Sequence, residues 1–159
     1  MLGALGLACQ QGEDSAGSPS TQDGVAFTRR ECQYLGLVRN LYVDDSSPAY
    51  DEISRMVGED RYSQTEAEAL LIDIRVAFRH ADDLLPPSPS LAKVYESLLT
   101  AIASQVEAAE LKMEVEADDP FYDSEKGAEA LYAGEKEIEA ADGLAAELES
   151  FLASRSGSC

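Results

Sequence analysis

Residues 63–118 have the sequence SQTEAEALLIDIRVAFRHADDLLPPSPSLAKVYESLLTAIASQVEAAELKMEVEAD. This stretch holds two amphipathic patterns that are separated by Pro86 and Pro87. Proline lacks a backbone N–H and its ring clashes with the preceding helical turn, so neither helix continues through the pair. Two long amphipathic helices joined by so short a turn favour antiparallel packing. The rest of the chain is therefore expected to assemble on a helical hairpin.

Each arm of the hairpin carries one apolar face with spacings of three and four residues, the periodicity of an amphipathic helix. In the first arm this face is Ala67, Leu71, Ile74, Phe78, Ala81 and Leu85; in the second it is Leu91, Val94, Leu98, Ile102, Gln105 and Ala109. Ser63 and Glu66 have the spacing of a capping box at the start of the first helix. Ser88 and Pro89 suit the N-cap and first position of the second helix, which Pro120 ends.

The chain before the hairpin predicts two further helices. Residues 25–43 carry a coarse apolar face, and Cys32 within it is interpreted as a small buried hydrophobe. The sequence DDSSP at positions 44–48 is expected to end this helix and to start another, because proline suits the first position of a helix. A short helix is therefore expected over residues 48–57, as an appendage of the bundle.

A last helix is expected from Asp123 or Ser124 to about Ala153. Its inward seam alternates spacings of three and four residues and consists of Leu131, Gly134, Ile138, Ala141, Ala145, Leu148 and Leu152. The predicted fold class is all-α: an up-and-down bundle of four main helices with one short extra helix. The bundle domain covers residues 25–153, and residues 154–159 are expected to form a frayed tail.

The 159 residues are 45% hydrophobic, which is ordinary for one globular domain with a modest core. The chain has 12 Lys and Arg against 31 Asp and Glu, a formal net charge of −19. Binding to nucleic acids or to anionic membrane surfaces requires clusters of positive side chains, so both are disfavoured. Solubility or adaptation to salt would explain the charge, and so would attraction of a basic protein or of metal ions.

Residues 1–24 precede the predicted domain as a signal remnant and a tether. They begin with an apolar stretch that ends in Ala8, directly before Cys9, and continue as a polar sequence without core-forming side chains. This arrangement resembles the cleavage region of a bacterial lipoprotein, although the apolar stretch is short and Gly6 stands where the class usually has leucine. The resemblance implies lipidation of Cys9, a flexible tether and an exported, membrane-anchored protein. The alternatives are an incidental cysteine and a cytoplasmic protein.

Acidic residues concentrate around the end of the second arm and the start of the last helix. The candidate site consists of Glu107, Glu110, Glu114, Asp118, Asp119, Asp123 and Glu125, with Phe121 and Tyr122 as a candidate recognition edge. Their spacing lacks the alternating ligands and central glycine of a calcium-binding EF-hand loop. Three interpretations remain open: a solvated face, weak binding of a cation, and a docking surface for a basic protein.

The sequence carries no catalytic or metal-binding motif. Three cysteines without a C-x-x-C pair form neither a disulfide framework nor a zinc or haem motif, so no cofactor is expected. A bridge from Cys159 to Cys32 would require an exposed Cys32, which its neighbours argue against. His80, the only histidine, lacks the Glu-x-x-His pattern of di-iron bundles. An enzyme would need polar residues buried between helices, and Gln105 is almost the only one in the predicted seams.

These observations favour a non-enzymatic protein. The Pro-Pro turn, the acidic turn and the small residues of the last helix are similar to those of uncharacterised exported bacterial helical bundles, over about residues 64–152. The first hypothesis is an acidic envelope protein that meets the membrane only through lipidated Cys9 and binds a partner or ligand through its acidic end. The alternative is a soluble acidic module, of the immunity or inhibitor kind, that neutralises a basic protein.

Overall fold

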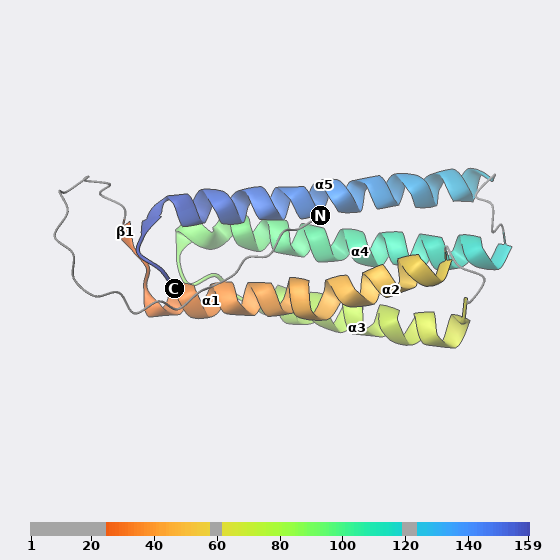
Figure 1. Ribbon diagram of the computed structural model, residues 1–159, viewed down its shortest axis with the longest axis horizontal. Helices are drawn as coiled ribbons and strands as arrows, with labels where there is room; N and C mark the ends of the chain where they lie inside the picture. The colour runs from red at the N-terminus through yellow and green to blue at the C-terminus, as the bar shows by residue number, and fades with distance from the viewer. Residues whose placement is uncertain (1–24, 58–61, 119–123) are drawn as a thin grey trace, which may run out of the picture.

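The computed structural model describes residues 25–57, 62–118 and 124–159. Their elements are β1 (Val25–Ala26), α1 (Arg29–Arg39), a π-helical segment (Asn40–Ser46), α2 (Ser47–Val57), α3 (Gln64–Asp82), a 3₁₀ turn (Pro89–Leu91), α4 (Ala92–Asp118), α5 (Glu125–Ala153) and β2 (Arg155–Ser156). Helices α1 and α2 lie end to end as one rod (Figure 1). This rod, α3, α4 and α5 run along the long axis in alternating directions, which confirms the predicted all-α bundle of four main helices.

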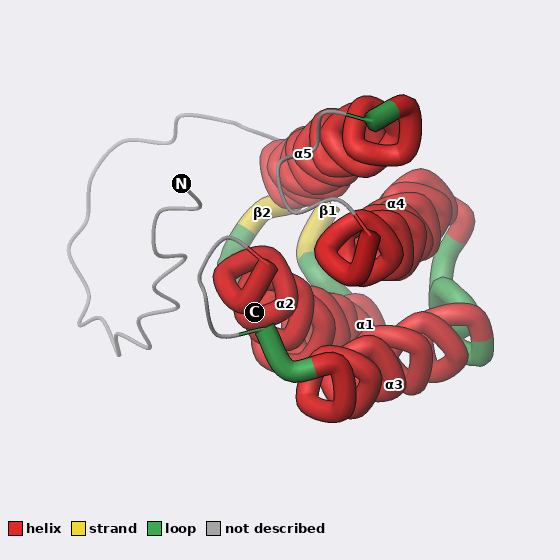
Figure 2. Tube along the Cα trace, turned by 90° about the vertical axis from the view of Figure 1, so that its right-hand side faces the viewer, coloured by secondary structure: helices red, strands yellow, loops and turns green. Residues whose placement is uncertain are grey.

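Helices α3 and α4 form the predicted hairpin, and α4 lies between α3 and α5 when the bundle is viewed end-on (Figure 2). Ile74 and Ala81 on α3 and Leu98 and Ile102 on α4 are fully buried, as their spacing predicts. Leu85 differs from the prediction and is 78% exposed. It lies beyond the end of α3, which stops before the two prolines are reached, so it no longer belongs to the helix face.

The capping box forms at α1 and not at α3. Ser63 is the N-cap of α3, but its side chain makes no capping hydrogen bond, so the predicted box of Ser63 and Glu66 is wrong. Thr28 caps α1: its Oγ1 accepts from the backbone N–H of Glu31 at 3.2 Å, and the Glu31 carboxylate accepts from the Thr28 N–H at 2.9 Å. Helix α1 therefore begins directly after Thr28, later than the sequence predicts.

The first rod continues through the predicted break. In the π-helical segment Asn40–Ser46, the chain winds more widely, and the backbone N–H of Ser47 donates to the carbonyl of Tyr42, five residues earlier. Pro48 follows directly. In a regular α-helix its ring would clash with the carbonyl four residues earlier, and the wider turn relieves that clash. Helix α2 therefore forms at the place of the predicted short helix and extends the line of α1.

The two ends of the described chain are joined at one end of the bundle. Strands β1 and β2 pair in parallel, with Val25 opposite Arg155 (Figure 2). A disulfide joins Cys32 to Cys159, whose Cα atoms are 5.3 Å apart. We call these contacts, together with the 2.7 Å ion pair of Glu31 and Arg155, the terminal clasp. The predicted frayed tail and unpaired Cys32 are therefore wrong, because Cys32 is only half-buried and the tail folds back to it.

Helix α5 packs chiefly against α4, with a face that is rotated from the predicted seam, of which Ala141 and Leu148 still pack against the core. Its buried residues are Gly127, Ala130, Ala133, Glu137, Leu144 and Phe151. Leu131 and Ile138, which belong to the predicted seam, are 60% and 59% exposed. This buried face combines small residues in its first half with the large side chains of Leu144 and Phe151 in its second half. Two other large apolar side chains of α5 remain in solvent.

Candidate functional site

A cluster of polar side chains lies between α2, α4 and α5. Its members, called the buried cluster below, are Ser47, Tyr50 and Ser54 of α2, Gln105 and Lys112 of α4, and Glu137 of α5. Gln105 and Glu137 are only 1% and 8% exposed. Helical spacing explains the grouping, because residues three, four or seven positions apart share one face of a helix. Three helices thus each present polar groups to the same interior region.

Gln105 connects all three helices of the buried cluster. Its Nε2 donates to the hydroxyl of Ser47 at 3.2 Å and to a carboxylate oxygen of Glu137 at 3.3 Å. Its Oε1 is buried without a hydrogen-bond partner, which costs about 1–3 kcal/mol. Burial raises the pKa of Glu137, and the Gln105 hydrogen bond and the charge of Lys112 oppose that shift. The effect of burial on this carboxyl group therefore outweighs the two partners that stabilise its charged form.

Lys112 binds α4 to α2. Its ammonium donates to the hydroxyls of Tyr50 and Ser54, at 2.9 Å each, and lies 4.6 Å from the centre of the Tyr50 ring. The second distance is within the range of a cation–π contact. Burial lowers the pKa of Lys112, and the negative charges of Glu137 and Asp51 oppose that shift. Such opposed shifts occur at functional sites and also in structural ion-pair networks.

The charges near the buried cluster come from both α2 and α5. Burial raises the pKa of Tyr42 to about 12, with further contributions from the charges of Glu137, Asp51 and Asp142. Asp51 stands on α2 and Asp142 on α5, so acidic residues of both helices act on one buried hydroxyl. Within the described ranges, His, Cys, Asp and Glu side chains form no group of three that could hold a metal ion.

The hydrogen-bond donors of the buried cluster point at acceptors of the protein itself. This arrangement suits a role in fixing how α5 lies on α2 and α4, because buried polar networks set the register of helices. Sequence reasoning recognised only Gln105 of this cluster. Lys112 could also have been predicted, because it lies two helical turns after Gln105 on the same face of α4. Glu137 could not have been predicted, because only the rotation of α5 brings it into the interior.

The predicted acidic site lies partly within the described chain. Glu107, Glu110 and Glu114 are exposed on α4, and Glu125 is exposed in the first turn of α5. Asp118 is the last residue of α4. The predictions for Cys9, Asp119, Phe121, Tyr122 and Asp123 fall outside the described residues. The structure therefore places four of the seven acidic residues on α4 and a fifth, Glu125, on α5.

Two carboxylates of this acidic surface have cationic partners. Glu110 accepts from Arg75 of α3 at 2.6 Å, and Glu114 pairs with Lys126 of α5. All four side chains are about half exposed. Ion pairs at such exposure contribute only about 0–1 kcal/mol, because water screens them. The acidic surface is thus partly neutralised on α4, and the pairs do little to hold the bundle together.

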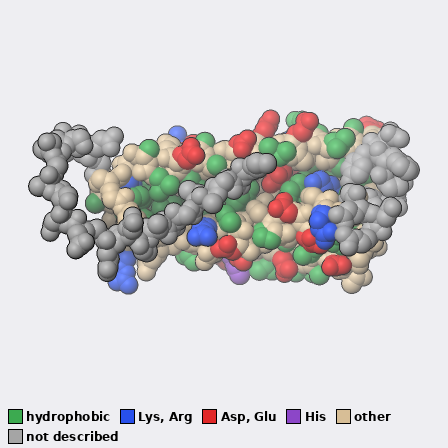
Figure 3. Space-filling view, viewed as in Figure 1, with side chains coloured by type: hydrophobic (Ala, Val, Ile, Leu, Met, Phe, Trp, Pro, Cys, Tyr) green, Lys and Arg blue, Asp and Glu red, His purple; other side chains and the backbone are tan. Residues whose placement is uncertain are grey.

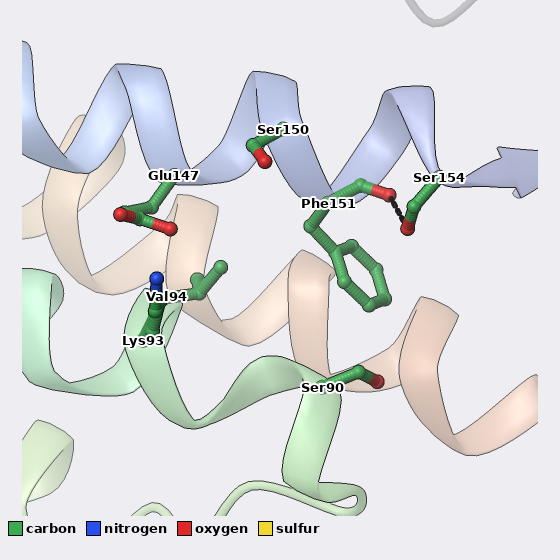
Figure 4. Close-up of a pocket in the computed structure, with 7 residues that line it drawn as sticks. All are labelled: Ser90, Lys93, Val94, Glu147, Ser150, Phe151 and Ser154. Atoms are coloured by element: carbon green, nitrogen blue, oxygen red, sulfur yellow. Dashed lines mark hydrogen bonds between the residues drawn. The ribbon is translucent and has the colours of Figure 1, made fainter.

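A small cavity lies between α4 and α5, beside the terminal clasp (Figure 4). Its volume is about 160 Å³, and it is lined by Ser90, Lys93, Val94, Glu147, Ser150, Phe151 and Ser154. Lys93 and Glu147 extend toward each other from the two helices. Pockets that bind drug-sized ligands usually enclose about 300–1,000 Å³. This cavity is therefore smaller than the pockets that hold drug-sized ligands.

Comparison with known proteins gives no family: no family model, curated protein sequence or solved structure matches this chain. Among the described residues, none of the helices is both long enough and apolar enough to cross a membrane. The function is therefore inferred from the contacts, burial and charges of the chain itself. Two features support that inference: the terminal clasp and the exposed acidic residues.

Proposed function

We propose that the protein is a non-enzymatic, exported protein of the bacterial envelope that is tethered through a lipid on Cys9 and binds a basic protein through its acidic surface. The observation that carries the proposal is the disulfide between Cys32 and Cys159. Disulfides persist in oxidising compartments outside the cytoplasm and are rare within it. The disulfide therefore supports export, which lipidation of Cys9 would require.

The charge of the chain supports the binding part of the proposal. The formal net charge is −19, and Glu107, Glu110, Glu114 and Glu125 of the acidic site are exposed. A surface of one sign attracts partners of the opposite sign and accelerates their association, most strongly at low ionic strength. The soluble alternative, a module that neutralises a basic protein, would use the same surface. The two hypotheses differ in the localisation of the protein: tethered to the membrane in the first, soluble in the second.

The first test is the intact mass of the native protein from the membrane and soluble fractions of cells, before and after reduction. A chain that begins at diacylated Cys9, and that gains the mass of two hydrogens on reduction, is the expected result. An unmodified chain beginning at Met1 in the soluble fraction would overturn the tether. That result would leave the soluble, partner-neutralising module as the better hypothesis.

The second test places a photo-crosslinking residue at position Glu107 of α4 in native cells. Glu68, an exposed acidic residue of α3, is the matched control position. A discrete adduct with a basic protein is expected at position Glu107 and not at position Glu68, with a yield that falls as salt is added. Equal adducts at both positions would contradict a specific acidic docking site.

A further inference from the structure

We propose that the outward side of α5 is a docking surface for a basic amphipathic helix of a partner protein. The surface, called the α5 stripe below, has an apolar line of Leu131, Ile138, Ala145 and Leu152 and an acidic rim of Glu135, Asp142 and Glu149. It is a different surface from the acidic site of α4. It therefore adds to the proposed function a second place of contact and the kind of partner element that fits it.

The apolar residues of the α5 stripe are exposed at regular intervals. Leu131 and Ile138 are more than half exposed, Leu152 is 38% exposed, and Ala145 is half-buried. They stand seven residues apart, which is two turns of helix, so their side chains form one line along α5. Single exposed apolar residues are common on soluble proteins. A line of them at heptad spacing is instead the pattern by which one helix packs on another.

Small residues stand between this line and the side of α5 that meets α4. Gly134 and Ala141 each stand three residues after a large apolar residue of the line. Both face the bundle, because a Cβ on Gly134 would come within 4.0 Å of Cε of Lys112 on α4, and Ala141 packs against the core. The large side chains of the apolar line therefore stand as a ridge on the outward side of α5, and such a ridge can pack into a groove of another helix. The surface shape of the α5 stripe thus suits the packing of a partner helix.

The acidic rim favours a basic partner and opposes a second copy of this chain. Glu135, Asp142 and Glu149 are exposed at seven-residue steps beside the apolar line. Asp and Glu side chains mark the edge of the molecule that α5 forms (Figure 3). Two copies joined through this surface would bring like charges together, each on a chain of net charge −19. Lys or Arg residues flanking an apolar helix face would instead pair with the rim.

The test uses the full chain and a labelled synthetic peptide, an amphipathic helix with Leu at heptad positions a and d and Lys on both flanks. Fluorescence anisotropy at physiological salt measures the affinity. Ile138→Ser and Leu131→Ser are each expected to weaken binding about tenfold or more, because each removes a large apolar contact. Leu85→Ser is the matched control, since Leu85 is equally apolar, 78% exposed and outside α5, and it should leave the affinity unchanged.

A second peptide of identical composition, rearranged so that no face is apolar, separates docking from general charge attraction. Equal affinity for both peptides, or unchanged binding by Ile138→Ser, would overturn the proposal. Light scattering during size exclusion tests the second copy as occupant. A dimer that Ile138→Ser abolishes would also overturn the basic-helix proposal. None of these readouts depends on Cys9 or Glu107, so this proposal and the proposed function fail separately.

Discussion

Glu31 joins three distant parts of the chain through one buried carboxylate. It accepts hydrogen bonds from the backbone N–H of Thr28 at 2.9 Å, from the hydroxyl of Ser88 at 3.0 Å and from the guanidinium of Arg155 at 2.7 Å. The Thr28 N–H has the largest part in lowering the pKa of Glu31 to about 2, against the opposing effect of burial. The start of α1, the turn before α4 and the C-terminal tail therefore depend on a single ionised group.

Low pH is expected to protonate the Glu31 carboxylate and so to weaken the contacts that it makes. Glu31 has a pKa of about 2 in the folded protein, against 4.5 for an ordinary glutamate. The unfolded chain binds more protons between these values, so the free energy of unfolding falls as pH falls through that window. Glu31→Gln should cost about 2–4 kcal/mol at neutral pH, and its difference from wild type should shrink toward pH 2. Urea unfolding across this pH range measures the effect. Glu68→Gln, at an exposed position, is the control. A difference between Glu31→Gln and wild type that does not change with pH would contradict the prediction.

Lys112 and Glu137 are expected to depend on each other. Burial shifts the pKa of each toward its neutral form, and the charge of the other opposes that shift. Lys112→Met and Glu137→Gln should each cost about 2–4 kcal/mol, because each leaves the other group buried without its opposite charge. The double variant should cost less than the sum by about 1–3 kcal/mol. Denaturant unfolding of the four proteins gives this coupling energy, and additive effects would show that the two groups act independently.

Among the elements, the π-helical segment Asn40–Ser46 behaves as an insertion, because a π turn holds one residue more than an α turn. Deleting exposed Val43 together with Pro48→Ala is expected to produce a regular helix in which α1 and α2 keep their inward faces. The free energy of unfolding should then stay within about 1 kcal/mol of wild type. Circular dichroism and urea unfolding measure helix content and stability.

Deletion of Gly36 in α1 is the control for this variant. It should turn the preceding residues by about 100° and carry buried Tyr34 out of the core, with a large loss of stability. Equal losses for the Gly36 and Val43 deletions would show that the π-helical segment does not absorb a residue.

How far the sequence predicts each element depends on whether the cause is local. The hairpin was predictable because Pro86, Pro87 and the adjacent apolar spacings act within a few residues. The face of α5 was not, because two overlapping series at three- and four-residue steps run along it, and only contact with α4 selects between them. The buried cluster and the disulfide depend on which helices meet. Cys32 and Cys159 are 127 positions apart, so no spacing within one helix indicates their pairing.

Over the whole molecule, 31 acidic residues stand against only 12 basic ones. The repulsion among the excess negative charges opposes the compact state. The Debye length falls from about 30 Å at 0.01 M salt to about 8 Å at 0.15 M. Added sodium chloride is therefore expected to raise the melting temperature measured by circular dichroism. The triple variant Glu107→Gln, Glu139→Gln and Glu149→Gln should gain less from the same salt. A melting temperature that does not change with salt would contradict the expected repulsion.

The disulfide also makes residues 32–159 a closed covalent ring. A protease that cuts once anywhere between Cys32 and Cys159 opens this ring but releases no piece of it. The nicked protein would migrate as one species on a non-reducing gel and separate into two after reduction. In the exported protein that we propose, which would meet proteases, a single cut would leave both pieces covalently attached.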